Sequence, residues 1–303
     1  MFDAMPLTDR VDDFGTFDWP EVRARNPSDK DLQRADGSGC IVLSGSDKVT
    51  RITDVVQRSP IRIIFPKTAD GALEEAVLVN TAGGIAGGDR LETGVTALGN
   101  ASIAITSQAA EKVYRALEEP ARITTRLKAY DVAKLAWLPQ ETIVFDRGRL
   151  RRETAIELSS TAELLALEWL VLGRVAHGEE MSGGQITDSW RVTRDDRLIW
   201  ADSFRVTDET FPHLHRKPLL SNCRAVATLI YFGPALDARL EFLRDVVRSL
   251  ECQCAATSVG GLIIVRLAAE VLYDLRVALQ NFLKQFSREL GGGPFHPPKM
   301  WSC

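Results

Sequence analysis

The sequence contains few of the residues that build redox and metal centres. Its 303 residues include five cysteines, four histidines and four methionines. An odd number of widely spaced cysteines is not typical of a disulfide framework. The one close pair, Cys252 and Cys254, lacks the second pair of ligands that a structural zinc site requires. We interpret this pair as a coincidence at the end of a helix, with binding of a soft metal such as copper or nickel as the alternative.

Long apolar runs are also missing. No stretch reaches the roughly 18 apolar residues of a membrane-spanning helix. The first ten residues lack the apolar core of a signal peptide. A net charge of −4 argues against binding to nucleic acid. We therefore expect a cytoplasmic protein whose partners include neither a nucleic acid nor a membrane.

The signatures of common enzymes are absent as well. The sequence has no G-x-S-x-G nucleophile elbow, no H-E-x-x-H helix and no P-loop. His177 stands alone beside Gly178, which is typical of a structural histidine. His213 and His215 lie in a proline-flanked loop, where solvated side chains are the simplest interpretation. We expect that the protein is not an enzyme; the alternative is a metal-dependent hydrolase that uses His213, His215 and an acid.

The most informative segment that is present is rich in glycine. Four of the six residues from 83 to 88 are glycine, a residue that adopts left-handed backbone conformations and permits close approach. Their spacing is not that of a dinucleotide-binding loop. The apolar residues after Asp89 are interrupted by Gly94 and Gly99, which is typical of strands and turns rather than of a helix. We interpret the segment as a turn between strands that holds Asp89 rigidly at its exit.

Short apolar or alternating runs recur along the first two thirds of the chain. Asp195-Asp196 predicts a hairpin turn between strands at 185–194 and 197–205. A helix is predicted at 163–172, with Gly173 as its C-terminal cap. The other runs, separated by glycine, proline and aspartate, predict strands at 41–43, 49–56, 61–65, 76–79, 101–107, 122–128, 134–138, 142–145 and 149–158.

The last third shows a different period. Apolar residues at helical spacing predict helices at 234–250 and 269–290, with a strand at 262–267 between them. Residues 1–35 are polar, of mixed charge and interrupted by three prolines, so we expect a flexible lead-in. Residues 36–303 are expected to form a single, mainly β domain with C-terminal helices. No β-α-β alternation is present, which disfavours a doubly wound sheet.

Four carboxylates lie beside glycine or proline in segments that we expect to be rigid. They are Asp89, Glu141, Asp146 and Glu179. Oxygen ligands suit loose and transient coordination of hydrated divalent cations, so these acids are candidates for the lining of a polar cavity. The alternative is ordinary salt bridges with neighbours such as Arg90, Arg147 and Arg174.

Five blocks of the sequence stand out in addition: residues 78–89, 106–115, 137–143, 172–179 and 298–303. They resemble the UreD (also called UreH) family of urease accessory proteins. Each block is weak by itself, but all occur in the order of the family and together reach from about residue 38 to the end. One block of the family reads Thr-Thr-Gln where this chain has Thr106-Ser107-Gln108, and the first 35 residues match nothing in it.

The resemblance implies both a fold and a function. The implied fold is mainly β, with stacked mixed sheets in a helicoid (β-helix-like) arrangement and C-terminal helices. The implied function is that of a non-enzymatic scaffold, a chaperone for nickel insertion into urease. It would bind the urease apoprotein and UreF, and through UreF the GTPase UreG. No tightly bound cofactor is expected; nickel is in transit through an internal tunnel.

From the same resemblance we predict that Asp89, Glu141 and Glu179 line the nickel passage, with Asp146 as an additional candidate. Ligands in such a passage have to bind weakly, because an ion that binds tightly midway does not arrive. A purely structural adaptor whose partners carry all the nickel is a further alternative.

Overall fold

The structure is a computed structural model that describes residues 34–47, 49–66, 73–174, 178–179 and 181–302. All of these residues belong to one compact unit, Arg34–Cys303. The lead-in predicted for residues 1–35 lies outside the described residues up to residue 33, and His177 also lies outside them. No helix of the described residues is both long enough and apolar enough to cross a membrane.

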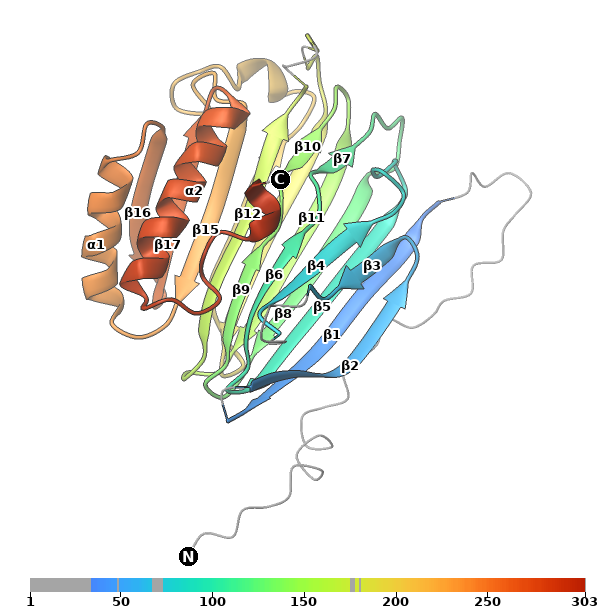
Figure 1. The fold of residues 1–303 in the computed structure, drawn as a ribbon. Helices are drawn as coiled ribbons and strands as arrows, with labels where there is room; N and C mark the ends of the chain where they lie inside the picture. The colour runs from blue at the N-terminus through green and yellow to red at the C-terminus, as the bar shows by residue number, and fades with distance from the viewer. Residues whose placement is uncertain (1–33, 48, 67–72, 175–177, 180, 303) are drawn as a thin grey trace, which may run out of the picture. The chain divides into compact units, whose positions relative to one another are not determined.

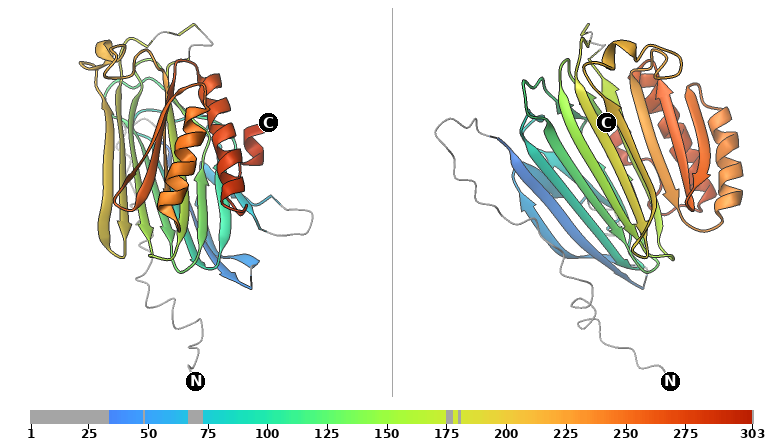
Figure 2. Two further views of the ribbon diagram at one scale, coloured as in Figure 1. Left: turned by 90° about the vertical axis from the view of Figure 1, so that its left-hand side faces the viewer. Right: turned by 180° about the vertical axis from the view of Figure 1, so that it is seen from behind.

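Two stacked β-sheets form the body of this unit (Figures 1 and 2). The first sheet has seven strands in the order β14-β13-β11-β8-β5-β1-β2. Its strands are β1 (Asp36–Ser46), β2 (Val49–Arg58), β5 (Arg90–Gly99), β8 (Ala121–Ala129), β11 (Arg149–Leu158), β13 (Gln185–Arg194) and β14 (Arg197–Val206).

The second sheet has ten strands. Eight follow the order β16-β17-β15-β12-β9-β6-β4-β3, while β7 and β10 form a branch that joins the sheet at β12. The strands are β3 (Ile61–Ile64), β4 (Glu75–Asn80), β6 (Ser102–Ser107), β7 (Glu111–Val113), β9 (Lys134–Leu138), β10 (Thr142–Val144), β12 (Glu163–Leu172), β15 (Ala225–Phe232), β16 (Gln253–Val259) and β17 (Leu262–Ala269).

Between β4 and β13 the chain winds back and forth between the two sheets. Strands β5, β8, β11 and β13 enter the first sheet and pair in parallel, while β4, β6, β9 and β12 do so in the second. Antiparallel strands, such as β2 and β14, complete both sheets. The predicted mainly β fold with stacked mixed sheets in a helicoid arrangement is therefore confirmed.

Two helices cover the outer face of the second sheet (Figure 2, left). They are α1 (Leu236–Arg248) and α2 (Leu272–Glu289), which confirms the helices predicted from apolar spacing. The apolar face of α2, including Leu279, Phe282 and Phe286, is buried against the sheet. A short 3-10 helix, η4 (Lys299–Ser302), lies on the same side (Figure 1).

The helix predicted at 163–172 is wrong, because these residues form β12. All ten of its residues are buried, since the first sheet covers one face of the strand and the helical layer covers the other. A strand buried on both faces has no polar alternation and reads as a continuous apolar run. Gly173 does have a left-handed φ of 83°, but it ends a strand rather than a helix.

The other predicted elements are confirmed. The predicted hairpin is formed by β13 and β14, and Asp195 and Asp196 both have a positive φ, as a tight hairpin turn requires. The glycine-rich segment is a turn between β4 and β5, as expected. Each of the other predicted strands overlaps a strand of the structure.

Candidate functional site

A cavity of about 180 Å³ lies between the two sheets. Thr93, Thr125 and Arg152 of the first sheet line one side of it, and Trp137, Thr142 and Glu168 of the second sheet line the other. Polar and charged side chains therefore face each other where a sandwich of two sheets usually has apolar packing.

The polar layer lies between two separate apolar clusters. One cluster contains Val95, Leu127 and Ile156, and the other contains Leu91 and Leu150, from the opposite ends of the same strands. Between them, neighbouring strands align three threonines in one row: Thr93 opposite Thr125, and Thr125 opposite Thr154. The parallel register therefore places hydroxyl groups side by side in the interior.

The cavity reaches the surface through a gap in the second sheet. Strand β12 pairs with β9 through residues 163–166 and with β10 through residues 170–172, so the sheet divides between them. Residues 107–111 and 138–142 cross this division, and we call these two segments the seam. The cavity is lined by Gln108, Ala109 and Gln140 of the seam, and the first two are exposed.

The glycine-rich turn borders the same opening. Gly83 and Gly84 line the cavity, and the Tyr114 hydroxyl donates a hydrogen bond to the Gly83 carbonyl oxygen at 3.0 Å. A Cβ atom at Gly84 would lie 2.6 Å from the Tyr114 ring. A side chain at this position would therefore have to displace the Tyr114 ring, which packs directly on the backbone.

A buried ion network closes the inner side of the cavity. Arg152 is 1% exposed and donates two hydrogen bonds to Asp188, at 2.8 and 2.7 Å. Its third nitrogen lies 2.8 Å from Glu168 and donates to the Thr142 hydroxyl at 3.1 Å. Since Asp188 belongs to the first sheet and Glu168 to the second, the guanidinium joins the two sheets.

Burial and neighbouring charges act in opposite directions on the pKa values of Arg152 and Glu168. Burial would lower the pKa of Arg152, but the carboxylates of Asp188 and Glu168 raise it, so the guanidinium stays charged. Burial raises the pKa of Glu168, which Arg152 and a hydrogen bond from the Trp137 indole nitrogen at 2.8 Å oppose.

Glu111 is the second acid of the cavity lining, and its surroundings differ. The Asn80 amide nitrogen lies 3.0 Å from both carboxylate oxygens, and the Lys112 backbone nitrogen donates at 3.2 Å. Within the part of the chain that the structure describes, Glu111 has no ion pair. Burial raises the pKa of this carboxyl group, because charging it there loses hydration.

Two of the acids predicted from the sequence have fixed partners. Asp89 is 6% exposed and accepts hydrogen bonds from the backbone nitrogens of Ala35, at 2.8 Å, and Ala86, at 2.7 Å. It is thus held rigidly at the exit of the glycine-rich turn, as predicted. Glu141 is 3% exposed and forms an ion pair with Arg276 of α2, with oxygen–nitrogen distances of 2.8 and 2.6 Å.

The other two predicted acids are neighbours. The Asp146 backbone nitrogen donates to Glu179 at 3.4 Å, and Glu179 also pairs with Arg174 at 2.8 Å. The hydrogen bond from Arg174 lowers the pKa of Glu179. Burial raises the pKa of Asp146, but the hydrogen bonds from Ser182 outweigh this effect, so the pKa lies below its usual value. The predicted salt bridge of Arg174 is therefore present.

None of the four predicted acids lines the cavity. Sequence reasoning missed Glu111 and Glu168, the two acids that do. Glu168 carried a readable signal, because it is the one charged residue inside the apolar run 164–172. The sequence around Glu111 gave no signal of a functional acid beyond its position in a block that resembles the UreD family.

The side chains considered for a resident metal site do not converge. Among the described residues, no three His, Cys, Asp or Glu side chains are arranged to hold a metal ion. His213 and His215 are exposed, with His213 at the end of a short 3-10 helix, Phe211–His213. Burial raises the pKa of Cys252 to about 12, so this thiol is protonated at neutral pH. The Cys254 thiol donates to the Val247 carbonyl oxygen at 3.0 Å.

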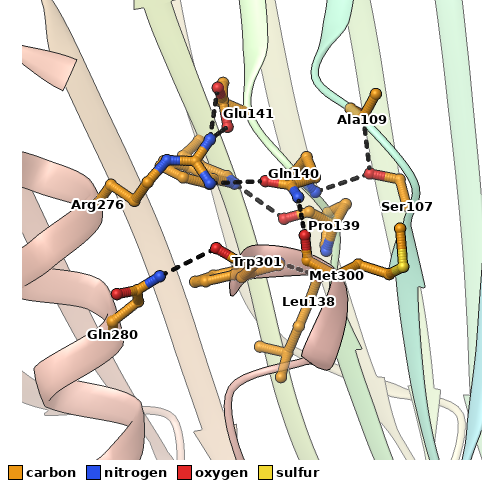
Figure 3. Close-up of polar contacts among 11 residues, drawn as sticks. Ser107, Ala109, Leu138, Pro139, Gln140, Glu141, Arg276, Gln280, Met300 and Trp301 are labelled. Carbon is orange, nitrogen blue, oxygen red and sulfur yellow. Dashed lines mark hydrogen bonds and ion pairs between the residues drawn. The ribbon is translucent and has the colours of Figure 1, made fainter. Parts of the chain in front are cut away.

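The C-terminal residues hold one side of the seam in place (Figure 3). The Gln140 amide donates to the Met300 carbonyl oxygen at 3.1 Å and accepts from Arg276 at 3.1 Å. The indole nitrogens of Trp301 and Trp169 donate to the carbonyl oxygens of residues 138 and 139, at 3.3 and 2.9 Å. Helix α2 and η4 therefore fix the segment that lines the cavity opening.

Comparison with known proteins identifies the family. A family model described as "UreD urease accessory protein" matches residues 35–302. The chain belongs to this family. The urease accessory protein UreD of Xanthobacter autotrophicus is 42% identical over 254 residues, which cover 84% of this chain and 87% of the relative.

Further relatives show the same extent of similarity. The UreD protein of Rhizobium etli is 38% identical, covering 89% of this chain and 96% of its own length. That of a Methylobacterium species is 36% identical, covering 91% and 97%. Membership of the UreD accessory-protein family confirms the resemblance seen in the sequence and the prediction that the chain is not an enzyme.

The buried network yields a first prediction. Arg152→Met should lower the free energy of unfolding by about 3–5 kcal/mol, because Asp188 and Glu168 are left buried without their cation. Arg151→Met is the matched control. The Arg151 side chain is 54% exposed, and its pair with Glu153 should be worth less than about 1 kcal/mol. Urea denaturation of both variants measures the difference, and equal midpoints would contradict the bridging role.

A second prediction concerns the C-terminal contact. Trp301 is 3% exposed and packs against Trp169 at 5.4 Å between ring centroids. Trp301→Ala should cost about 3–5 kcal/mol of stability, as for other buried tryptophans. Tyr273→Ala removes an aromatic ring of α2 that is 69% exposed, and should change stability by less than about 0.5 kcal/mol. Thermal melting compares the two, and a similar shift in both would refute the assignment.

Proposed function

We propose that this chain is a scaffold for urease maturation that conducts nickel to the urease active site. In this role it binds the urease apoprotein and UreF, reaches the GTPase UreG through UreF, and acts in the cytoplasm. The names of its relatives and the description of its family support a part in urease assembly. The observation that carries the nickel proposal is the polar cavity between the two sheets.

The chemistry of the cavity suits a cation in transit. Hydroxyl, amide and carboxylate oxygens line it beside apolar side chains such as Leu91 and Ile123. Divalent nickel exchanges from a few oxygen ligands more readily than from nitrogen or sulfur ligands. The two apolar clusters on either side restrict such an ion to the polar layer, since they offer no replacement for its hydration shell. Nickel is the cargo of this passage and not a resident cofactor.

Blocking the cavity tests the conduit directly. Thr125 is 1% exposed and lines the cavity, so Thr125→Phe places a ring inside it. Thr124→Phe is the matched control, because adjacent residues of a strand point to opposite faces. With purified urease apoprotein, UreF and UreG, Thr125→Phe should slow nickel-dependent activation roughly tenfold, which corresponds to a barrier higher by about 1.4 kcal/mol.

Two controls accompany this experiment. Both phenylalanine variants should assemble with urease and UreF to the same extent as the unaltered chain, as measured by size-exclusion chromatography. Unchanged activation by a folded and assembled Thr125→Phe variant would rule out the conduit and leave a structural adaptor as the function.

The four acids chosen from the sequence do not line this cavity, and their part in the passage stays a prediction to be tested separately. Asp89, Glu141, Glu179 and Asp146 should each lower activation when changed to Ala, while the complex stays assembled. Because Asp89 accepts two backbone hydrogen bonds, Asp89→Ala should also cost about 1–3 kcal/mol of stability. Activation per assembled complex is therefore the quantity to compare. Normal values in all four variants would exclude them from the passage.

A further inference from the structure

The opening of the cavity contains one acid, Glu111, that forms no ion pair among the described residues, although the exposed Lys112 lowers its pKa through a weaker charge interaction. Four charged residues line the cavity: Glu111, Lys112, Arg152 and Glu168. Arg152 is held between Asp188 and Glu168, and the Lys112 side chain is exposed. The hydrogen-bond donors to Glu111 are neutral groups, the Asn80 amide and a backbone nitrogen.

The position of Glu111 is fixed by both sides of the seam. Its backbone nitrogen donates to the Glu141 carbonyl oxygen at 2.8 Å, and its strand pairs with β10, where Thr142 is opposite. Glu141 is in turn held by Arg276. The carboxylate therefore stands at the point where the exposed segment Gln108–Ala109 meets the interior, on a backbone that the C-terminal layer keeps in place.

Asn80 orients this carboxylate from the opposite side. Its amide oxygen accepts a hydrogen bond from the Ala82 backbone nitrogen at 3.0 Å, so its amide nitrogen is the group that faces Glu111. The Asn80 amide and the Lys112 backbone nitrogen do not use all the lone pairs of the carboxylate. Glu111 is half-buried, so its carboxylate has lost part of its hydration without gaining an ion pair, and a divalent cation that arrives beside it offsets that loss.

From this arrangement we infer that Glu111, oriented by Asn80, is the site where the divalent cation enters the cavity. This inference rests on the proposed function. A single carboxylate without an ion-pair partner attracts a hydrated divalent cation without supplying the several ligands of a storage site. It provides a weak first contact, from which the ion passes to the hydroxyl groups of the polar layer.

The test removes the negative charge of Glu111 and then places a negative charge at the neighbouring position 80. Glu111→Gln keeps the shape of the side chain and removes its charge. The double variant Glu111→Gln/Asn80→Asp restores one carboxylate at the same place. Glu118→Gln is the matched control, since Glu118 is an exposed acid of the following loop and does not line the cavity.

Urease activation in the reconstituted complex is measured against the concentration of nickel ion. Glu111→Gln should raise the concentration for half-maximal activation roughly tenfold, an effect of the size expected for one unit charge close to the ion in a partly solvated site. It should melt at or above the temperature of the unaltered chain, because the neutral amide loses less hydration than the half-buried carboxylate. The double variant should recover most of the loss, and Glu118→Gln should show no change.

The possible outcomes separate the two proposals. If Thr125→Phe slows activation but Glu111→Gln does not, the passage stands and Glu111 is not its point of admission. If Glu111→Gln slows activation and the charge at position 80 does not restore it, Glu111 has only a structural role, and the inference fails. If neither variant has an effect, both the passage and its admission site are refuted.

Discussion

The Arg152 guanidinium is the constraint that makes a polar interior possible. Two sheets that face each other normally exclude charge from the space between them. Here one cation is shared by an acid from each sheet, so three charged groups are buried with their hydrogen bonds satisfied. Removing the cation leaves both acids buried without a counter-charge. The ion pairs of Arg152 therefore link the two sheets directly. The threonine row and the cavity lie beside this network.

The second sheet has two regions that differ in packing and polarity, according to which strand pairs with β12. Where β12 pairs with β9, apolar packing is continuous on both faces. Where it changes partner to β10, the seam opens and polar groups of the backbone need partners from elsewhere. The indole nitrogens of Trp169 and Trp301 supply two of them, at the carbonyl oxygens of residues 139 and 138. One of these donors therefore comes from β12 of the divided sheet itself and the other from the C-terminal η4.

Much of the fold could be predicted from the sequence, because most strands and both helices expose one face and keep a readable period. The strand β12 was not predictable in this way, since it is covered on both faces. The same difference applies to the candidate site. The Arg174–Glu179 pair is local and was foreseen as an alternative, whereas Glu141 meets Arg276 across 135 positions of the chain. Glu111 and Glu168 face one cavity only because two sheets bring distant strands together.

The row of Thr93, Thr125 and Thr154 carries a consequence for how such a chain can change in length. Successive members are about 30 positions apart, and each belongs to a different coil of the winding. An insertion in a connecting loop leaves the row aligned. An insertion or deletion of one residue inside β5, β8 or β11 turns the hydroxyl outward and brings its outer neighbour into the interior. The interior lining is therefore encoded as much by the lengths of the strands as by the identity of their residues.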